Sequence, residues 1–527
     1  MPRPGKNWLP AAASAGLALL LYAVTLGGTY VYDDRYIVES DPRISHPDQW
    51  SLFWTTDYFN GGPDNLYRPL VSMSYAIQWW LHGTAASRAW LFHMVNLFLH
   101  AAVCASVAEL ARRLLGFRVA LIAGLLFAAH PVHVEAVANI VGRAELMCAL
   151  GITIALVLFL HRPLTAPRAL AIWGAGVLAL LSKEQGMLLP LALLALVPVR
   201  RAAVAQLEER PVDEPQHPTQ LAYATPQPTE RKAALLLILL LCWTLAAYII
   251  FRESRLKFWW DRSFLDWTIN PLVRSTGADR YLLPIALFGR YVALLFFPLQ
   301  LNIDYGPRVI LPTLSPHDPY LYLGVAGAAL AAILLTVALL RRDWKAAYPL
   351  FGFALFYSVI SNLLTLIGVH FAERLIYIPS VFFLVLIAQV LASLRRPWLV
   401  LIVAVLLVLF STRTVTYAWK WNDRRQLFEY ALANHPQSVR LHLLVAEEMR
   451  LAGRYDEAEA VLARGRALQP DYFKLWLDSA QNQYEKGDFP RAREFILRAD
   501  ALRPSVKMTK LYDLLTTDTT PTTGPAR

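Results

Sequence analysis

The chain is short of cysteine and of charge. Its 527 residues include three cysteines, Cys104, Cys148 and Cys242, and each lies within an apolar run. No disulfide bond is therefore expected, and the redox compartment is not indicated. Charged residues amount to 17% of the chain and hydrophobic residues to 56%. This composition excludes a soluble protein of two or three domains and indicates a polytopic membrane protein.

The net charge of +11 does not indicate a nucleic-acid-binding protein. The basic residues collect in pairs at the ends of apolar runs, which is typical of cytoplasmic loops. We therefore expect contact with a lipid bilayer and no binding of nucleic acid. The pairs are Arg112-Arg113, Arg200-Arg201, Arg231-Lys232, Arg341-Arg342 and Arg395-Arg396.

About eleven or twelve apolar runs approach the roughly 20 residues that a membrane span needs. The first has no small-residue cleavage site, so we expect a signal anchor. The basic residues before the first run are expected to lie inside, so residues 29–89 form the first external loop. If successive runs then cross the membrane in alternating directions, the chain has eleven crossings and an external C-terminus. Whether 281–298 crosses is left open. The runs lie near residues 9–28, 90–115, 118–137, 141–161, 169–181, 187–199, 233–251, 281–298, 320–340, 347–367, 377–394 and 398–411.

Two adjacent carboxyl groups, Asp33 and Asp34, stand in this external loop just beyond the first apolar run. Adjacent anions repel each other, and burial near the apolar phase raises the cost of keeping both charged. A general base, a group that orients an acceptor or a metal ligand is indicated, and a solvated turn is the alternative. Arg68 in the same loop offers a guanidinium for a carboxylate or a phosphate.

The segment containing His130, His133 and Glu135 ends an apolar run near the predicted outer face. One helical turn roughly aligns the two histidines, which is compatible with a metal ion. However, Pro131 disturbs that geometry and the spacing fixes no third ligand. Histidines that form hydrogen bonds in a polar cleft are favoured over a metal site.

Further ionisable residues meet the same predicted face. Basic residues collect in cytoplasmic loops, but Arg143 falls on the predicted external side. An arginine in this position favours an anionic partner. Carboxylates at this face could deprotonate a hydroxyl, and cations could stabilise a departing lipid-linked phosphate. Ion pairs that only fix helix packing are the alternative. The residues are Arg143, Lys183, Glu184, Asp304, Glu373 and Arg374.

A repeat of 34 residues follows the last apolar run. Gly453 recurs as Gly487 in the same local pattern. The pattern is typical of tetratricopeptide repeats, whose stacked helix pairs form a concave surface. We expect a short repeat domain over 412–505 that contacts a peptide or a partner protein, with a purely structural cap as the alternative. A helix end and a disordered tail are expected over 506–527.

Seven motifs occur in a fixed order ahead of these repeats. They are Tyr32-Asp33-Asp34, Tyr67-Arg68-Pro69, Phe92 to Asn96, His130 to Glu135, Gly142 to Glu145, Ser182-Lys183-Glu184 and Ala372-Glu373-Arg374. From about residue 9 to 505 the chain resembles the transmembrane and tetratricopeptide-repeat O-mannosyltransferases and their bacterial relatives. The resemblance implies an all-α fold. A GT-C type membrane bundle of about 11 transmembrane helices would occupy residues 1–411, followed by a tetratricopeptide-repeat α-solenoid.

The resemblance also implies an activity. A sugar, typically mannose, would pass from a polyprenyl-phosphate donor to Ser or Thr hydroxyls of an acceptor protein, with no cofactor required. Asp33 and Asp34 would be the catalytic pair, with Asp33 favoured as the base and the other orienting the acceptor. The donor phosphate would bind Arg143, Lys183, Arg374 and Arg68. The cleft would be lined by His93, His130, His133, Glu135, Glu145, Glu184 and Asp304.

The chain departs from the eukaryotic proteins in having a short repeat array. With compact loops and no endoplasmic-reticulum retrieval signal, this favours a multi-pass enzyme of a bacterial inner membrane. Its active site and repeats would face the periplasm, whereas a eukaryotic protein would lie in the endoplasmic-reticulum membrane. Transfer of another lipid-linked sugar to protein, glycan or lipid is one alternative, and a non-catalytic scaffold that recruits partners is another.

Overall fold

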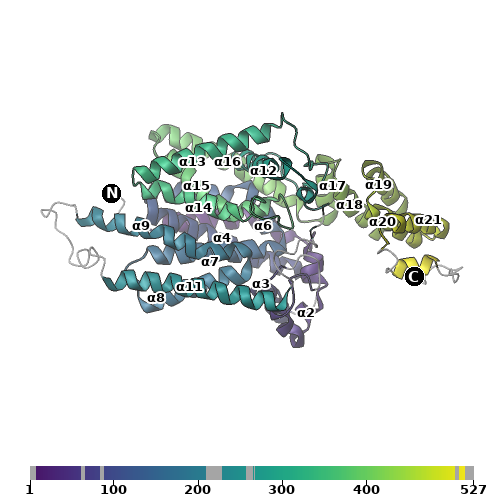
Figure 1. The fold of residues 1–527 in the computed structure, drawn as a ribbon, viewed down its shortest axis with the longest axis horizontal. Coiled ribbons are helices and arrows are strands. Elements are labelled where there is room, and N and C mark those ends of the chain that lie inside the picture. Colours follow the sequence, from purple (N-terminus) through teal and green to yellow (C-terminus); the bar gives the residue numbers. More distant parts are fainter. Residues whose placement is uncertain are drawn as a thin grey trace. The chain divides into compact units, whose positions relative to one another are not determined.

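The chain folds into helices arranged in two compact units (Figure 1). The computed structural model describes residues 7–60, 66–82, 88–208, 228–256, 265, 267–504 and 510–516, and every regular element within them is helical. The predicted all-α fold is therefore confirmed. The first unit comprises Met1–Leu265, Ser275–Leu301 and Thr313–Asn422, and the second comprises Asp266–Arg274, Asn302–Pro312 and Asp423–Arg527.

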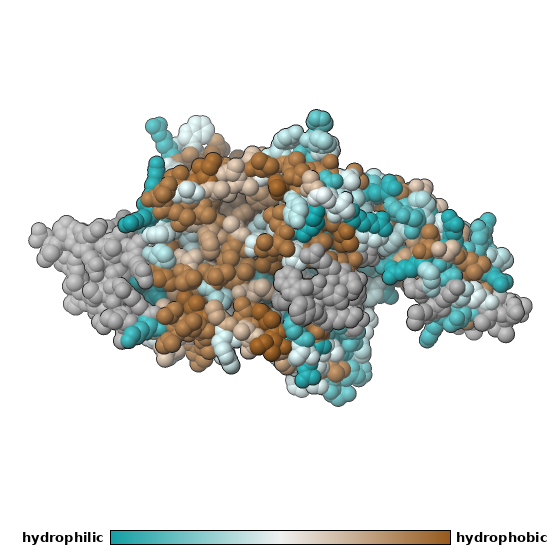
Figure 2. Space-filling model, viewed as in Figure 1, coloured by the Kyte–Doolittle hydropathy of each residue, from teal (hydrophilic) through white to brown (hydrophobic). Residues whose placement is uncertain are grey.

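Long apolar helices form most of the first unit. Among the described residues, seven helices are long and apolar enough to cross a membrane. An eighth span results if α5 (Phe117–Ala129) and the segment Pro131–Ala138, bent by 53°, are taken together. Figure 2 shows apolar residues covering the side of this bundle. The protein is a multi-pass membrane protein. The seven spans are Leu9–Gly27, Ala89–Leu115, Ile140–Leu160, Lys232–Arg255, Pro319–Leu340, Glu373–Ala392 and Arg396–Lys420.

The helices α4, α7, α11, α13, α15 and α16 of these spans are labelled in Figure 1. The helix α4 packs against α1, α5 and α7, so it lies among the spans that carry the polar motifs. The helices are α1 (Leu9–Tyr22), α4 (Ala89–Leu115), α7 (Arg143–Leu160), α11 (Pro228–Arg255), α13 (Pro319–Leu340), α15 (Tyr377–Ala392) and α16 (Arg396–Lys420).

Four further helices of this unit are not among the spans. They coincide with four of the predicted apolar runs, so eleven crossings remain a prediction. They are α8 (Ala166–Ser182), α9 (Leu189–Glu208), α12 (Asp279–Phe296) and α14 (Trp344–Ser358).

The run predicted at 347–367 is helical only as far as Ser358, where α14 ends. The side chain of Asn362 organises the following turn, since its amide donates to the carbonyls of Ile360 and His370 at 3.3 and 3.2 Å. Asn362 itself has a φ of 57°. Hydropathy alone does not register such a side-chain-to-backbone turn.

The described residues of the segment predicted as the first external loop belong to the first unit and form short helices. Their apolar side chains surround Tyr75, which is fully buried. At the centre, the guanidinium of Arg43 forms a buried ion pair with Asp41 at 2.6 Å. It also donates to the carbonyls of Asp57 and Tyr58 at 2.8 and 3.0 Å, so one arginine ties the loop together. The helices are α2 (Pro42–Ser45), a 3-10 helix at Pro47–Trp54 and α3 (Pro69–His82).

The second unit contains paired helices. Gly465 lies where α19 touches α20, and a Cβ at this position would lie only 2.7 Å from Cδ2 of Leu475. A small residue is therefore needed at this contact. Gly487 ends α20 in the left-handed conformation, with a φ of 91°. The predicted tail falls largely outside the described residues, as do residues 209–227 between the basic pairs Arg200-Arg201 and Arg231-Lys232. The helices are α17 (Arg424–Asn434), α18 (Val439–Leu451), α19 (Tyr455–Leu468), α20 (Phe473–Lys486), α21 (Phe489–Leu502) and α22 (Lys510–Thr516).

Two segments from far earlier in the chain complete this unit. The carboxylate of Asp304 accepts a hydrogen bond from Ser438 Oγ at 2.7 Å and lies 3.8 Å from Arg440. The ring of His435 contacts the carbonyl of Asp304 at 2.9 Å, and the amide of Asn302 donates to the carbonyl of Ala431 at 3.0 Å. Asp304 therefore fastens its own segment to the turn between α17 and α18.

Candidate active site

The two carboxyl groups of the acidic pair have different surroundings. Asp34 is fully buried, and its oxygens accept hydrogen bonds from the backbone N–H groups of Val141 and Val31 at 2.8 and 3.2 Å. Burial raises its pKa to about 8, although these hydrogen bonds oppose the shift. Asp34 is therefore mostly protonated at neutral pH. Asp33 keeps 22% of its side chain exposed.

The backbone near the pair has two unusual features. Tyr32, directly before the pair, has a φ of 52°, a left-handed conformation that is costly for a bulky residue. On the other side, a Cβ at Gly142 would lie 2.2 Å from the carbonyl oxygen of Ala136. Glycine is therefore required beside Val141, whose N–H holds Asp34. This tight turn joins the acidic pair to the start of α7.

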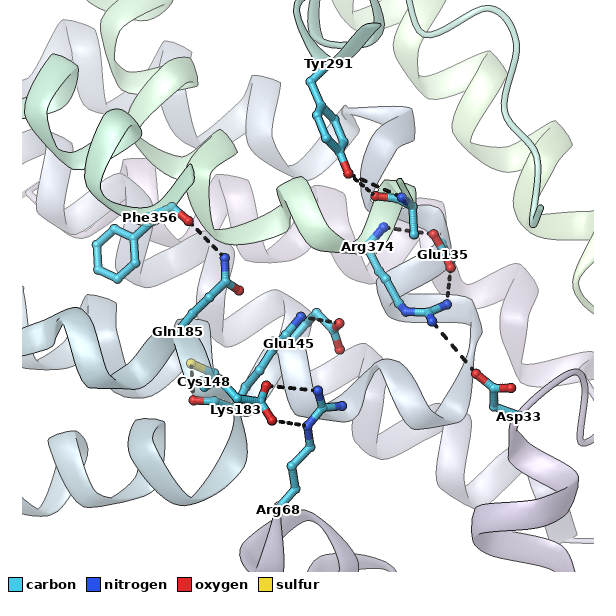
Figure 3. Close-up of polar contacts among 12 residues, drawn as sticks. Asp33, Arg68, Glu135, Glu145, Cys148, Lys183, Gln185, Tyr291, Phe356 and Arg374 are labelled. Atoms are coloured by element: carbon cyan, nitrogen blue, oxygen red, sulfur yellow. Dashed lines mark hydrogen bonds and ion pairs between the residues drawn. The ribbon is translucent and has the colours of Figure 1, made fainter. Parts of the chain in front are cut away.

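Arg374 joins two carboxylates from different parts of the chain (Figure 3). Its guanidinium donates to Glu135, and its backbone N–H donates to the other oxygen of Glu135 at 2.8 Å. Its Nη2 also lies 3.9 Å from Oδ2 of Asp33. Glu135 is 1% exposed, whereas Arg374 and Asp33 keep 16% and 22% of their side chains exposed. The structure thus brings three of the predicted site residues together.

Two further ion pairs lie beside this group. Nζ of Lys183 lies 2.5 Å from Oε1 of Glu145, with both side chains buried. Nη2 of Arg68 lies 3.0 Å from Oε2 of Glu184, and both side chains are mostly buried. Glu145 interacts electrostatically with Arg68 and with Arg374, so the pairs form one charged cluster. Figure 3 shows Lys183, Glu145 and Arg68 facing one another.

We call these seven residues the charged cluster. Its three cations are outnumbered by four carboxylates, which gives a formal charge of −1 when all are ionised. Each cation already contacts a carboxylate, so an anionic ligand would either share a cation with a carboxylate or replace one of these contacts. The members are Asp33, Arg68, Glu135, Glu145, Lys183, Glu184 and Arg374.

Arg143 lies apart from these ion pairs. It is 1% exposed, and its guanidinium donates to Asn96 Oδ1 at 2.9 Å, Gln78 Oε1 at 2.9 Å and Ser74 Oγ at 3.2 Å. It also lies over the ring of Tyr75, 4.5 Å from its centroid. In this arrangement Arg143 links α3, α4 and α7. The sequence reasoning did not select Gln78 or Ser74, although a glutamine within an apolar helix is a visible signal.

The predicted cleft histidines are buried and form hydrogen bonds. His93 contacts the carbonyl of Thr29 at 3.2 Å, His130 the carbonyl of Leu295 at 3.0 Å, and His133 the hydroxyl of Ser380 at 2.8 Å. Nothing in the sequence pattern distinguishes Ser380, which lies within the apolar helix α15. Within the described residues, no group of three or more His, Cys, Asp or Glu side chains is placed to hold a metal ion. Asp304, which was assigned to the cleft, lies in the second unit with Ser438.

Comparisons with known proteins agree with the sequence motifs. A tetratricopeptide repeat family model matches residues 449–510, which confirms the predicted repeats in that region. Protein O-mannosyl-transferase tmtc2 of Xenopus laevis is 35% identical over 187 residues, which are 33% of this chain and 22% of that protein.

Two other relatives match over most of this chain. Protein O-mannosyl-transferase Tmtc1 of Drosophila melanogaster is 27% identical over 86% of this chain and 60% of its own length. Human protein O-mannosyl-transferase TMTC3 is 22% identical over 94% of this chain and 55% of its own. The chain is therefore a relative of these protein O-mannosyl-transferases, as predicted, but the match spans less than two thirds of their length.

One solved structure also aligns with the chain. The alignment with the apo oligosaccharyltransferase of Archaeoglobus fulgidus covers 85% of this chain and 60% of that chain, at 14% sequence identity. The TM-score is 0.36, which is too low to support an argument about the fold.

Proposed function

We propose that this relative of the protein O-mannosyl-transferases is a glycosyltransferase that uses a polyprenyl-phosphate-linked sugar, with mannose as the favoured sugar. The acceptor is a Ser or Thr hydroxyl of a protein. The observation that carries the proposal is the contact of Asp33 with Arg374. A partly exposed carboxylate beside a cation provides a base and an anion-binding group in one place.

The acidic pair divides its tasks by burial. Asp33 is the base because its side chain is accessible. Asp34, held by Val31 and Val141 and protonated near neutral pH, positions the loop that presents Asp33. The different surroundings support this assignment over the reverse one.

The transfer is a single displacement that inverts the anomeric carbon. The acceptor oxygen forms a bond to that carbon while its proton passes to the Asp33 carboxylate. The bond between the anomeric carbon and the phosphate oxygen breaks, and its electron pair leaves with polyprenyl phosphate. Arg374, Arg68 and Lys183 stabilise the additional negative charge on this phosphate. Arg143 supports the site through α3, α4 and α7. This scheme requires no cofactor.

The proposed site faces the extracytoplasmic side of the membrane. Support comes from Arg112 and Arg113 near the end of α4 and from Arg341 and Arg342 after α13, since such pairs mark cytoplasmic ends. We further propose a GT-C type bundle of eleven crossings in a bacterial inner membrane. The repeats would then contact the acceptor protein from the periplasm.

Transfer of radiolabelled mannose from polyprenyl-phosphate mannose to protein tests this function in membranes. We expect Asp33→Asn to lower the rate by about 10²- to 10⁴-fold, the usual contribution of a general base. Asp48→Asn, at an exposed carboxylate of the 3-10 helix Pro47–Trp54, is the matched control and should keep full activity. Full activity in Asp33→Asn would refute the proposed site. Transfer from another lipid-linked sugar but not from mannose would refute the sugar assignment alone.

A further inference from the structure

We infer that the donor phosphate displaces Asp33 from Arg374, so that donor binding frees the base for the acceptor. This inference rests on the proposed function, and it adds an order of events to it. It also gives Glu135 a role, that of the positioning residue which holds Arg374 during the exchange.

Arg374 is held much more firmly by Glu135 than by Asp33. Glu135 receives hydrogen bonds from both the guanidinium and the backbone N–H of Arg374, and it is 1% exposed. The contact with Asp33 is 3.9 Å long, beyond hydrogen-bond distance, and both side chains are partly exposed. Asp33 is therefore the carboxylate that can be exchanged, while Glu135 stays in place.

The other cations of the charged cluster offer an incoming anion less room. Lys183 lies 2.5 Å from Glu145, and these side chains are 4% and 3% exposed. Arg68 lies 3.0 Å from Glu184, with side chains 13% and 17% exposed. Breaking either contact would leave a more deeply buried carboxylate without its partner. The side of Arg374 that faces Asp33 is thus the least costly place for a phosphate oxygen to enter.

The exchange has a consequence for the acceptor. While Oδ2 of Asp33 lies 3.9 Å from Nη2 of Arg374, this oxygen is directed at a cation rather than at an acceptor hydroxyl. A phosphate bound to Arg374 would repel the Asp33 carboxylate and release it from Arg374, so that it can accept the proton of an acceptor hydroxyl. The donor would then bind before productive engagement of the acceptor, which limits proton abstraction when no sugar is in place.

The inference predicts an unusual property of an inactive variant. Asp33→Asn removes the competitor of the phosphate, so binding of a polyprenyl phosphate should become about two- to five-fold tighter, as expected for a partly exposed ion pair. Binding is measured with the full chain in lipid nanodiscs. The probes are undecaprenyl phosphate and dolichyl phosphate, each compared with its free alcohol, which isolates the contribution of the phosphate.

A double-mutant cycle separates competition from simple charge repulsion. The gain from Asp33→Asn should be present with Arg374 and absent in an Arg374→Gln background. An equal gain in both backgrounds would assign the effect to through-space repulsion and overturn the inference. No gain would overturn it as well. Asp33→Ala repeats the cycle with a second side chain, in case the first variant does not fold.

The same experiment distinguishes this inference from the proposed function. If the wild-type protein binds neither phosphate more tightly than the alcohol, the donor class itself is wrong. If the wild-type protein binds the phosphate but Asp33→Asn brings no gain, only the exchange at Arg374 is wrong.

Discussion

The ammonium group of Lys183 lies 2.5 Å from Oε1 of Glu145, and these two side chains are 4% and 3% exposed. Such a buried pair is costly to break because the remaining partner is left charged in an apolar setting. The pair also joins the start of α7 to the segment that follows α8.

We predict that Lys183→Met or Glu145→Leu alone destabilises the protein by about 3–5 kcal/mol, while the double variant loses much less than the sum. The measurement is thermal and denaturant unfolding in detergent. The exposed Arg425–Glu429 pair of α17 is the control, since Arg425→Met should cost no more than about 0.5 kcal/mol. Additive losses for Lys183 and Glu145 would contradict the prediction.

The raised pKa of Asp34 predicts a pH dependence of stability. The folded-state pKa is about 8, well above the usual value for an aspartate, so the folded protein holds a proton that the unfolded chain releases. The contribution of Asp34 is therefore fully present below about pH 4 and is lost as pH rises towards 8, at up to about 1.4 kcal/mol per pH unit.

The difference in melting temperature between wild type and Asp34→Asn isolates this contribution, because other titrating groups are common to both proteins. We expect the melting temperature of wild type minus that of Asp34→Asn to fall steadily between pH 5 and pH 8, because only wild type loses the contribution of the protonated carboxyl group over this range. A constant difference over this range would show that Asp34 does not carry the proton.

Arg43 should be essential for the fold of the first predicted external loop. Arg43→Ala leaves Asp41 buried without its partner and also removes the contacts to the carbonyls of Asp57 and Tyr58, so a loss of about 3–5 kcal/mol is expected. Arg43→Lys should restore only part of this stability, because an ammonium group cannot reproduce the planar arrangement of donors of the guanidinium. Limited proteolysis within residues 41–60 gives the measurement. Unchanged protection in Arg43→Ala would contradict this role.

Gly142 should tolerate no side chain. Its added Cβ would lie 2.2 Å from a backbone oxygen, which must move, and we expect Gly142→Ala to cost about 1–3 kcal/mol or more. Gly174 is the matched control because a Cβ there meets nothing within 4 Å, so Gly174→Ala in α8 should be neutral or stabilising. Equal melting temperatures for the two variants would contradict the close approach at Gly142.

Asp304→Ala should loosen the turn between α17 and α18. It leaves Ser438 without its acceptor and removes the charge beside Arg440, at an expected cost of about 1–3 kcal/mol. Hydrogen exchange of residues 431–442 should rise. Arg308→Ala, which removes a single contact with Gln469, is the control and should change this exchange little. Unchanged protection in Asp304→Ala would show that other contacts hold the turn.

The sequence indicated the ionisable residues of the charged cluster because they interrupt apolar segments. It did not indicate their partners, since Arg374 and Glu135 are 239 positions apart and only the fold brings them together. The same holds for Asp304, since Ser438, whose hydroxyl donates to its carboxylate, lies 134 positions later.

The end of α14 shows a further limit of sequence reasoning. An apolar run predicts burial and helix, but the turn made by Asn362 depends on carbonyl groups that become neighbours only after folding. Repeats were easier to recognise, because the recurrence of Gly453 as Gly487 at a spacing of 34 residues is visible in the sequence itself.

The composition of the second unit has a consequence for how the protein can be divided. A fragment cut at Asp423 would contain all the repeat helices but would lack Asn302–Pro312, which belongs to the same compact unit. Recombination that exchanged only the C-terminal part of the gene would face the same mismatch. The repeats and the earlier segment that bears Asp304 are therefore expected to be inherited, and engineered, together.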